Sequence, residues 1–247
     1  MSNFLSHTFD GVLRRAKGAA RLALPQRCEL CAGPSGDALV CVGCELTLPR
    51  AATACPVCAL PTSLGATCGA CLAHPPPYDA TLAAYIYSFP ADRLVQAFKY
   101  HGRLALAEWC ANAIVAKRSN QQATSPPPSA IIPLPLATKR QRERGFNQAA
   151  EIARVVAART GISLVRSGVQ RIGSSAPQAA LPWADRARNV RGAFACALDL
   201  TGARIVVVDD VMTTGATLAE FARTLKAAGA AHVENWVVAR TPPPHAS

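Results

Sequence analysis

Two neighbouring carboxylates follow directly on a run of four β-branched residues, Ile205–Val208, and lead into a turn of small and hydroxyl residues, TTGAT. The β-branched run predicts a buried strand that delivers Asp209 and Asp210 to its carboxyl end. A helix beginning near Ala216 has unpaired backbone N–H groups in its first turn, and these suit a phosphate that Gly215 lets approach closely. A ribose can donate hydrogen bonds from its vicinal hydroxyls to the acids, so we expect a ribose 5-phosphate here. The expected ligand-binding residues are Asp209, Asp210, Val211, Thr213, Thr214, Gly215, Ala216 and Thr217.

Three other interpretations of this acidic strand end stay open. A Walker-B-type strand also ends in acids, although no G-x-x-x-x-G-K-[ST] motif occurs in the chain. A receiver-type Mg²⁺ site uses paired acids but does not need the TTGAT turn. In the simplest interpretation, a capped helix follows the strand and both acids are solvated.

Eight of the ten cysteines form four Cys-x-x-Cys pairs. Each such turn aims two thiolates at one point, and two turns complete a tetrahedral shell around Zn²⁺. We expect two structural zinc ions, because a thioredoxin-like redox site needs only one pair and a chain without an export signal rarely uses disulfides. Sequential pairing is the prediction, while nested or crossed pairing stays open. The expected ligands are Cys28, Cys31, Cys41 and Cys44 for one ion, and Cys55, Cys58, Cys68 and Cys71 for the other.

The composition fits a medium-sized domain plus a small one, since the 247 residues are 50% hydrophobic. A formal net charge of +11 and a pI near 9.5 favour polyanionic partners. No apolar run approaches the roughly 18 residues of a membrane-spanning helix. Arginines interrupt the start of the chain, unlike in a secretory signal, so we expect a cytoplasmic protein without a transmembrane segment.

Changes in composition divide the chain into successive pieces. Residues 1–24 place apolar side chains at helical spacing among arginines and lysines, which predicts a basic amphipathic helix. The cysteine-rich piece, 25–77, ends in a proline run that neither helix nor sheet can continue, and it is expected to form a double zinc-ribbon domain. An α/β domain is expected over 78–240, with a polar linker at 118–130 and a disordered tail at 241–247.

Strand and helix patterns alternate from residue 78 onward, which predicts a mainly parallel sheet covered by helices on both faces. In such sheets, ligands bind beyond the carboxyl ends of the strands, where the strand order reverses. The loops after Leu136 and Asp209 both follow predicted strands, so we expect them to be part of a site. Strands are expected at 81–89, 131–136, 162–165, 204–209 and 232–239, and helices at 91–100, 104–117, 147–159 and 216–228.

The segment IVVVDDVMTTGATL resembles the phosphoribosyl pyrophosphate (PRPP) motif of type I phosphoribosyltransferases, and further segments narrow the resemblance to the ComF family of competence-associated proteins. These are the paired cysteines, FKYHG at 98–102, IPLPL at 132–136, RGFNQ at 144–148, Gln178 with Arg186 and Asn189, and GAF at 192–194. The resemblance covers nearly the whole chain after Pro25. It implies an α/β fold of the type I phosphoribosyltransferase kind, with a mainly parallel sheet, preceded by a small cysteine-rich zinc-ribbon domain.

The resemblance also implies how PRPP and Mg²⁺ would be held. The loop around Leu134–Thr138, which in this class often contains an unusual cis peptide, would bind pyrophosphate, and the basic residues after it would neutralise this leaving group. A solvated basic loop is the alternative. Arg171 and the region around residues 178–189 would form a mobile hood. The residues implied for pyrophosphate are Pro135, Leu136, Lys139, Arg140, Asn147 and Lys99, and those implied for catalysis are Asp209, Asp210 and Arg144.

Two functions follow from these expectations. The first is a phosphoribosyltransferase that transfers ribose 5-phosphate from PRPP, which the intact motif favours. The second is a non-catalytic, cytoplasmic single-stranded DNA-binding protein of the competence machinery, which the positive charge and the basic loop favour. A competence helicase and other DNA-processing proteins are the partners that this role implies. Base stacking would depend on a few aromatic residues, namely Tyr78, Tyr85, Tyr100, Phe146 or Trp183.

Overall fold

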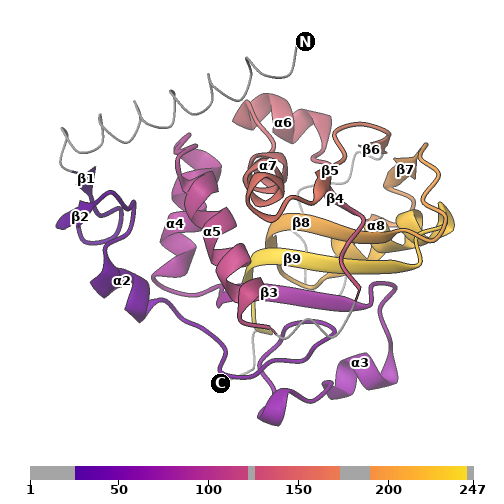
Figure 1. Ribbon diagram of the computed structural model, residues 1–247, viewed down its shortest axis with the longest axis horizontal. Coiled ribbons are helices and arrows are strands. Elements are labelled where there is room, and N and C mark those ends of the chain that lie inside the picture. Colours follow the sequence, from indigo (N-terminus) through magenta and orange to yellow (C-terminus); the bar gives the residue numbers. More distant parts are fainter. Residues whose placement is uncertain (1–25, 122–125, 173–189, 244–247) are drawn as a thin grey trace. The chain divides into compact units, whose positions relative to one another are not determined.

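The computed structural model describes residues 26–121, 126–172 and 190–243 (Figure 1). The predicted basic helix in 1–24, the hood residues from Gln178 to Asn189, and the last four residues of the predicted tail lie outside this part. The chain divides into two compact units between Leu48 and Pro49. This division separates the two cysteine groups, whereas the sequence suggested a boundary near residue 77. The second group therefore belongs to the larger unit.

The smaller unit has little apolar material of its own. A short antiparallel pair, β1 (Gln26–Arg27) and β2 (Pro34–Gly36), precedes the helix α2 (Val42–Thr47). Val40 and Leu48 are among its few buried hydrophobic residues. Since so small a core contributes little folding free energy, the four cysteines around it are the natural source of stability.

The larger unit is built on a five-stranded sheet in which every strand pairing is parallel. The strand order is β3-β9-β8-β4-β5, so β8 lies at the centre. Its run Val206–Val208 is fully buried, as expected for a strand covered on both faces. The strands are β3 (Ala80–Ile86), β4 (Ala130–Pro133), β5 (Ser163–Leu164), β8 (Arg204–Met212) and β9 (His232–Arg240).

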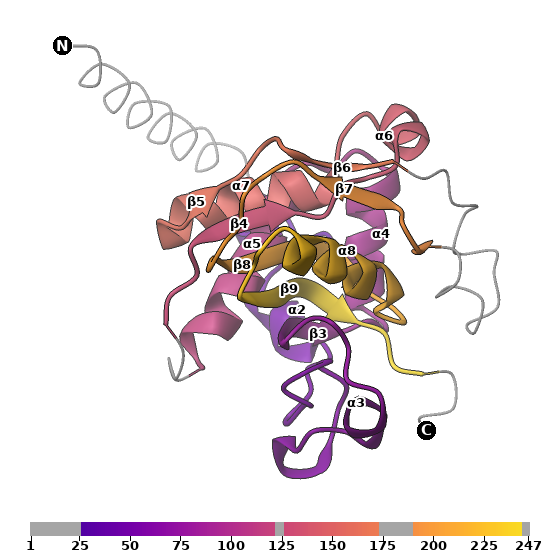
Figure 2. The same cartoon turned by 90° about the vertical axis from the view of Figure 1, so that its right-hand side faces the viewer.

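Helices cover both faces of this sheet. The connection from β4 to β5 and the connection from β8 to β9 run in opposite directions along the sheet, and right-handed crossovers therefore place their helices on opposite faces. Figures 1 and 2 show α7 and α5 on one face and α8 on the other. The helices are α4 (Ala91–Tyr100), α5 (Leu106–Ser119), α6 (Thr138–Arg144), α7 (Gln148–Thr160) and α8 (Ala216–Ala227).

The second cysteine group is integrated into the larger unit. Its segment contains the 3-10 turn η1 (Ser63–Gly65) and the short helix α3 (Gly69–Ala73). The amide of Thr81 in β3 donates to the carbonyl of Pro56 at 3.0 Å. Cys55 and Cys58 are buried in the same hydrophobic cluster as Tyr78 and Met212. These cysteines are thus part of the core beneath the sheet edge.

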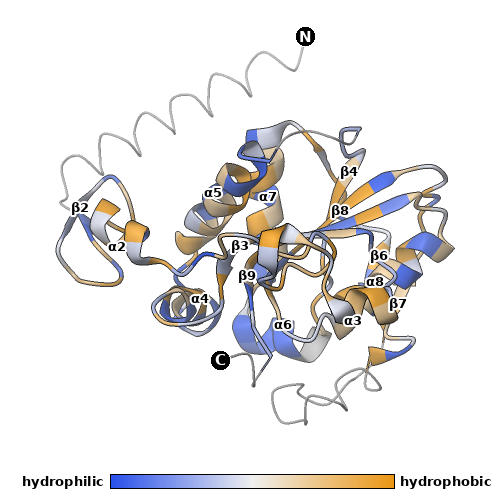
Figure 3. Cartoon of the chain, turned by 90° about the horizontal axis from the view of Figure 1, so that it is seen from below, coloured by the Kyte–Doolittle hydropathy of each residue, from blue (hydrophilic) through white to orange (hydrophobic). Residues whose placement is uncertain are grey.

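In the part of the larger unit from residue 78 onward, one helix and one pair of strands were not predicted from the sequence. The first is α6, which is hydrophilic along its length (Figure 3) and therefore lacks an apolar stripe. The second is an antiparallel pair, β6 (Val169–Arg171) and β7 (Phe194–Cys196), whose three-residue strands lie far apart in the sequence. The described residues contain no helix that is long and apolar enough to span a membrane.

Candidate functional site

The two acids lie within the central strand, close to its carboxyl end. β8 continues to Met212 because β9 pairs with it as far as Arg240, so the strand is three residues longer than predicted. Asp210 is buried and Asp209 partly buried. The backbone N–H of Asp210 donates to Oδ1 of Asp209 at 2.9 Å. The loop after β4 reaches the same edge, where the amide of Leu134 donates to the carbonyl of Val208.

Lys99 is the cation that compensates this acidic strand end. It comes from the last turn of α4, and its Nζ lies 2.9 Å from Oδ1 of Asp210. Both side chains are largely shielded from solvent. Burial disfavours the charged ammonium, but Asp210 outweighs this effect and holds the pKa of Lys99 above its ordinary value. The lysine that resemblance assigned to the ligand thus forms an ion pair with the acids.

Asp209 is the acid of the pair whose charged form is disfavoured. Burial and the neighbouring charge of Asp210 raise the pKa of the Asp209 carboxyl to about 7, against the opposing effects of Lys99 and Arg144. A carboxyl with such a pKa sits between its neutral and charged forms at neutral pH. A ligand that donates hydrogen bonds to it stabilises the charged form.

The turn after β8 leads into the N-terminus of α8, where we expect the phosphate. Gly215 caps α8 with φ at 81°, which favours glycine, and a Cβ built there would lie 2.6 Å from Met212 Cε and 3.0 Å from the Tyr78 hydroxyl. The hydroxyl of Thr214 accepts from the amide of Ala216 at 3.2 Å. The N–H groups of the first turn of α8 therefore lie directly beyond the acids. Of the other residues expected here, Val211 pairs with Ala239 within the sheet, Thr213 precedes this turn, and Thr217 lies in the first turn of α8.

The loop between β4 and α6 contains Pro135 and Leu136, both partly buried. Asn147 fixes it in place: its Nδ2 donates to the carbonyl of Leu134 at 3.1 Å while its Oδ1 caps α7. Asn147 therefore positions the loop through both ends of its amide. Among the described residues, the cis peptide is the Phe89–Pro90 bond, so the unusual cis peptide expected around Leu134–Thr138 is not found.

Arg144 is the last residue of α6. Its Nη1 donates to Gln148 Oε1 at 3.0 Å, and its guanidinium lies over the ring of Tyr100, 5.2 Å from the centroid. Arg144 Nη2 also donates to the Tyr100 hydroxyl at 3.5 Å, next to Lys99, and the charge of Arg144 lowers the pKa of Asp209. Arg140 lies within the same helix. Burial and the positive charge of Arg140 lower the pKa of Arg171. Lys139 lies in α6 too, but its side chain is outside the described part of the structure.

Sequence reasoning missed Gln148 as a buried donor and Arg240 altogether. The Nε2 of Gln148 is buried without a hydrogen-bond partner next to Arg144. Arg240 is buried at the end of β9 and donates to the backbone around the turn after β8. RGFNQ could have drawn attention to Gln148. Arg240 has no motif, because it acts on main-chain carbonyls.

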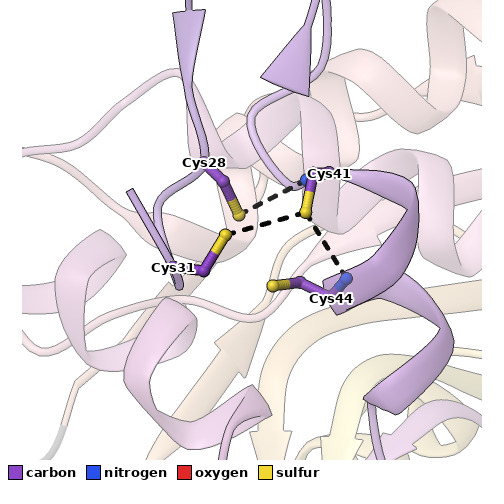
Figure 4. Close-up of side chains that lie close together, drawn as sticks. All are labelled: Cys28, Cys31, Cys41 and Cys44. Atoms are coloured by element: carbon purple, nitrogen blue, oxygen red, sulfur yellow. Dashed lines mark hydrogen bonds between the residues drawn. The ribbon is translucent and has the colours of Figure 1, made fainter. Parts of the chain in front are cut away.

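The eight paired cysteines form two separate four-thiol groups. Within each group the sulfur atoms all lie within 4.8 Å of one another. In the first group, Sγ of Cys31 and Cys41 are 3.8 Å apart (Figure 4), and in the second, Sγ of Cys58 and Cys68 are 3.6 Å apart. A tetrahedral Zn²⁺ with Zn–S bonds of about 2.3 Å places its sulfurs about 3.8 Å apart, so both donor sets fit the ion. The two groups follow the sequential order of the cysteine pairs along the chain.

Backbone amides prepare one thiolate in each group. Burial raises the pKa of Cys28, but N–H groups, with that of Cys41 foremost, overcome this effect and lower it to about 6. In the second group, the amide of Cys68 has the same role for Cys55, whose pKa falls to about 7. The equivalence of the two patterns supports two copies of one ribbon motif.

Comparisons with known proteins agree with this architecture. A model described as "Phosphoribosyl transferase domain" matches residues 143–244, and a model described as "Double zinc ribbon domain" matches residues 19–72. "DNA utilization protein YhgH" of Salmonella typhi is 32% identical over 225 residues, which cover 89% of this chain and 99% of that protein. "Competence protein F" of Haemophilus influenzae is 32% identical over 181 residues, covering 70% of this chain and 78% of that protein. "Competence protein ComFC" of Bacillus subtilis is 26% identical over 220 residues, covering 83% and 85%.

The chain belongs to the ComF family. This confirms the resemblance inferred from the motifs, and the predicted fold class is confirmed with it. The ComF-family chain thus joins a phosphoribosyltransferase-like domain to two zinc-ribbon cysteine groups. Of the predicted site residues, the structure brings Lys99, Asp210 and Arg144 to the edge where β8 ends.

Proposed function

We propose that this ComF-family protein binds PRPP as its magnesium complex and transfers the ribose 5-phosphate group to an acceptor during DNA uptake. One observation carries the proposal. Two acids lie near the carboxyl end of the central strand of a parallel sheet, and beyond Met212 a turn with Gly215 leads into the N-terminus of α8. This is the switch point of the strand order, between β4 and β8, where ligands of such sheets bind.

Each part of PRPP has a matching group at this edge. The ribose hydroxyls donate to Asp209 and Asp210, and the 5-phosphate accepts from the N–H groups at 213–217. The pyrophosphate lies on the loop at 134–138, facing Arg144 and the basic helix α6. Mg²⁺, when bound together with PRPP, would neutralise negative charge on the leaving group.

In the transfer step, the bond between the anomeric carbon and the pyrophosphate oxygen breaks, and its electron pair leaves with the pyrophosphate. The acids stabilise the positive charge that develops on the sugar, while Arg144 stabilises the negative charge on the leaving group. The acceptor forms the new bond to the anomeric carbon and releases its proton to solvent. Lys99 keeps Asp210 oriented throughout by their ion pair.

The proposal predicts that binding depends on both acids. We expect Asp209→Asn/Asp210→Asn to weaken Mg–PRPP binding about 100-fold, because two charge-assisted hydrogen bonds are lost. Calorimetric titration measures this loss. Asp199→Asn is the matched control, since Asp199 is an exposed acid whose carboxylate bonds only within its own turn to Thr201. Equal affinity of wild type and the double variant would refute the pocket, and pyrophosphate release with a panel of bases and amines tests turnover.

We further propose that each four-cysteine group holds one Zn²⁺. The fit of the sulfur spacing supports this, as does the small core of the first unit. Elemental analysis of protein purified without chelator is expected to give about two zinc ions per chain. A zinc-free, folded protein would refute the assignment.

A second candidate function is binding of single-stranded DNA in the cytoplasm, alongside a competence helicase or other DNA-processing proteins. The observation that favours it is Tyr100, which is 66% exposed with Arg144 over one face of its ring. An exposed aromatic ring next to a cation suits an unstacked base. The other predicted stacking residues are less suitable, since Tyr78 and Tyr85 are buried and Phe146 is partly buried, while Trp183 lies outside the described residues.

Tyr100→Ala separates the two functions. We expect it to weaken binding of an oligothymidylate roughly tenfold, which is the contribution of one stacked base. Mg–PRPP affinity is expected to change much less, because the acid pair and the phosphate turn (residues 213–217) are not altered and Arg144 keeps its hydrogen bond to Gln148. If oligonucleotide affinity did not change with salt concentration, a surface that binds the DNA phosphates would be contradicted.

A further inference from the structure

Arg240 occupies an unusual position at the end of β9. Its side chain is buried, with only 4% of the residue exposed. β9 pairs with β8 up to Met212, so Arg240 lies beside the start of the phosphate turn. A buried guanidinium with no role in the sheet pairing requires partners that explain its burial.

The partners of Arg240 connect the second cysteine group to the phosphate turn. Its Nε donates to the carbonyl of Cys58 at 2.7 Å. Its Nη1 donates to the carbonyls of Met212 at 3.1 Å and of Thr213, and also to that of Thr241 at 2.7 Å. One guanidinium therefore holds a cysteine turn on one side and the first residues of the phosphate turn on the other.

Tyr78 makes a second connection between the same two places. It is buried in the hydrophobic cluster that contains Cys55 and Cys58. Its hydroxyl lies against Gly215, where it would meet an added Cβ at 3.0 Å. The phosphate turn thus lies on a base formed by Arg240, Tyr78 and the second cysteine group.

The second cysteine group would balance the charge of Arg240 when it holds zinc. Among the described residues, no carboxylate lies within ion-pair distance of the guanidinium, which donates to the carbonyls of Cys58, Met212, Thr213 and Thr241. Four thiolates around one Zn²⁺ carry a net negative charge of two. A zinc-bound group would therefore supply a counter-charge for the buried arginine.

We propose that Arg240 is a positioning residue that couples metal occupancy of the second cysteine group to the order of the phosphate turn. With zinc bound at Cys55, Cys58, Cys68 and Cys71, Arg240 holds the carbonyls of Met212 and Thr213, and the N–H groups that follow converge on the phosphate. The first cysteine group lies in the other compact unit. The inference rests on the proposed zinc and PRPP sites.

Hydrogen exchange measured without PRPP tests the coupling, so its outcome is separate from that of the proposed function. In Arg240→Gln we expect both zinc ions to be retained and the amides of residues 213–219 to exchange roughly tenfold faster or more. Amides of α7 within 150–158 are expected to keep their wild-type rates, which a general loss of stability would not allow. Mg–PRPP affinity is expected to fall about tenfold. Arg240→Lys, which keeps the charge but loses the fork, should show an intermediate effect.

Selective zinc removal provides the matched comparison. In a Cys31→Ser/Cys44→Ser background, the remaining zinc occupies the second site alone, and we expect the phosphate turn to exchange as in wild type. Chelator treatment of this variant should then accelerate exchange at 213–219. When Arg240→Gln is added to the variant, the chelator should cause almost no further acceleration, because both changes break the same connection. The inference would be overturned if the chelator did not change the exchange rates at 213–219, or if it accelerated exchange in α7 to the same degree. If the coupling is present and PRPP fails to bind, only the proposed ligand is wrong.

Discussion

At the scale of single residues, the candidate site contains two adjacent acids that lower the stability of the fold. Asp209 and Asp210 are adjacent, and Lys99 compensates only one of them directly. The raised pKa of Asp209 means that the folded protein resists ionising this carboxyl. Such a group is retained when its charge is needed for a ligand rather than for folding.

This imbalance predicts that Asp209→Asn stabilises the free protein at alkaline pH. Because the folded-state pKa lies above the unfolded value of 3.8, the carboxyl destabilises the fold increasingly as pH rises from the unfolded value through the folded value near 7. One pKa unit corresponds to about 1.4 kcal/mol, and solvent screening of this partly exposed group reduces the expected gain to about 1–2 kcal/mol near pH 8. Urea unfolding at about pH 5 and about pH 8 measures it, with a smaller gain expected at the lower pH.

Mg–PRPP affinity should follow the opposite trend with pH. Ionised Asp209 is the acceptor for the ribose hydroxyls, so wild-type affinity is expected to increase as pH rises through about 7, and the variant should lack this dependence. If Asp209→Asn were less stable than wild type near pH 8, the raised pKa assigned to Asp209 would be wrong.

The sequence predicts which residue types form the site but not how they pair. DDVMTTGAT identifies the acids and the turn because their order along the chain is the order in space. The contact of Lys99 with Asp210 joins residues on different elements, and Arg240 recognises carbonyls that every residue carries. Neither interaction leaves a pattern in the local sequence.

At the scale of elements, accuracy followed the strength of the hydrophobic pattern. α4 was predicted at its observed bounds, since its apolar side chains recur at helical spacing and Pro90 precedes it. β8 extends beyond the acids because pairing with β9 continues, and pairing overrides the polarity of Asp209 and Asp210. α6 was missed because its own residues are polar or charged on every side of the helix. Only its C-cap, Gly145 at a φ of 77°, marks its end.

The turn between β8 and α8 predicts a specific requirement for glycine. Gly215→Ala places a Cβ against Met212 and Tyr78 at a positive φ, and we expect a loss of about 1–2 kcal/mol in stability. Mg–PRPP affinity should also fall about tenfold or more, because the turn must shift to relieve the contact. Thermal unfolding and calorimetric titration measure the two effects.

Gly202→Ala is the matched control for backbone strain alone. Gly202 has a φ of 72°, but an added Cβ would meet nothing within 4 Å, and the residue precedes the opposite end of β8. We expect a modest loss of stability of about 1 kcal/mol and unchanged Mg–PRPP affinity. Equal loss of affinity in both variants would show that the close contact at Gly215 is irrelevant.

At the scale of the whole molecule, the two ribbons differ in what they stabilise. They match one double-ribbon model and have equivalent thiol geometry, yet the compact units divide between them. The sequence could not reveal this difference, because the cysteine spacing is the same in both, and the proline run at residue 77 suggested a later boundary. What separates them is burial: Cys55 and Cys58 lie in the core of the larger unit with Tyr78.

This division predicts the outcome of two truncations. A chain of residues 49–247 retains the second cysteine group and the complete sheet, so we expect it to fold, to bind about one zinc ion, and to bind Mg–PRPP like the full chain. A chain of residues 78–247 follows the boundary that the sequence suggested, but it exposes Tyr78 and leaves Arg240 without the Cys58 carbonyl. We expect this shorter chain to aggregate or unfold at a markedly lower temperature, because apolar core surface and a buried charge both lose their cover. Size-exclusion chromatography, thermal unfolding and zinc content distinguish the two. Equal behaviour of both truncations would mean that the second ribbon is as separable as the first.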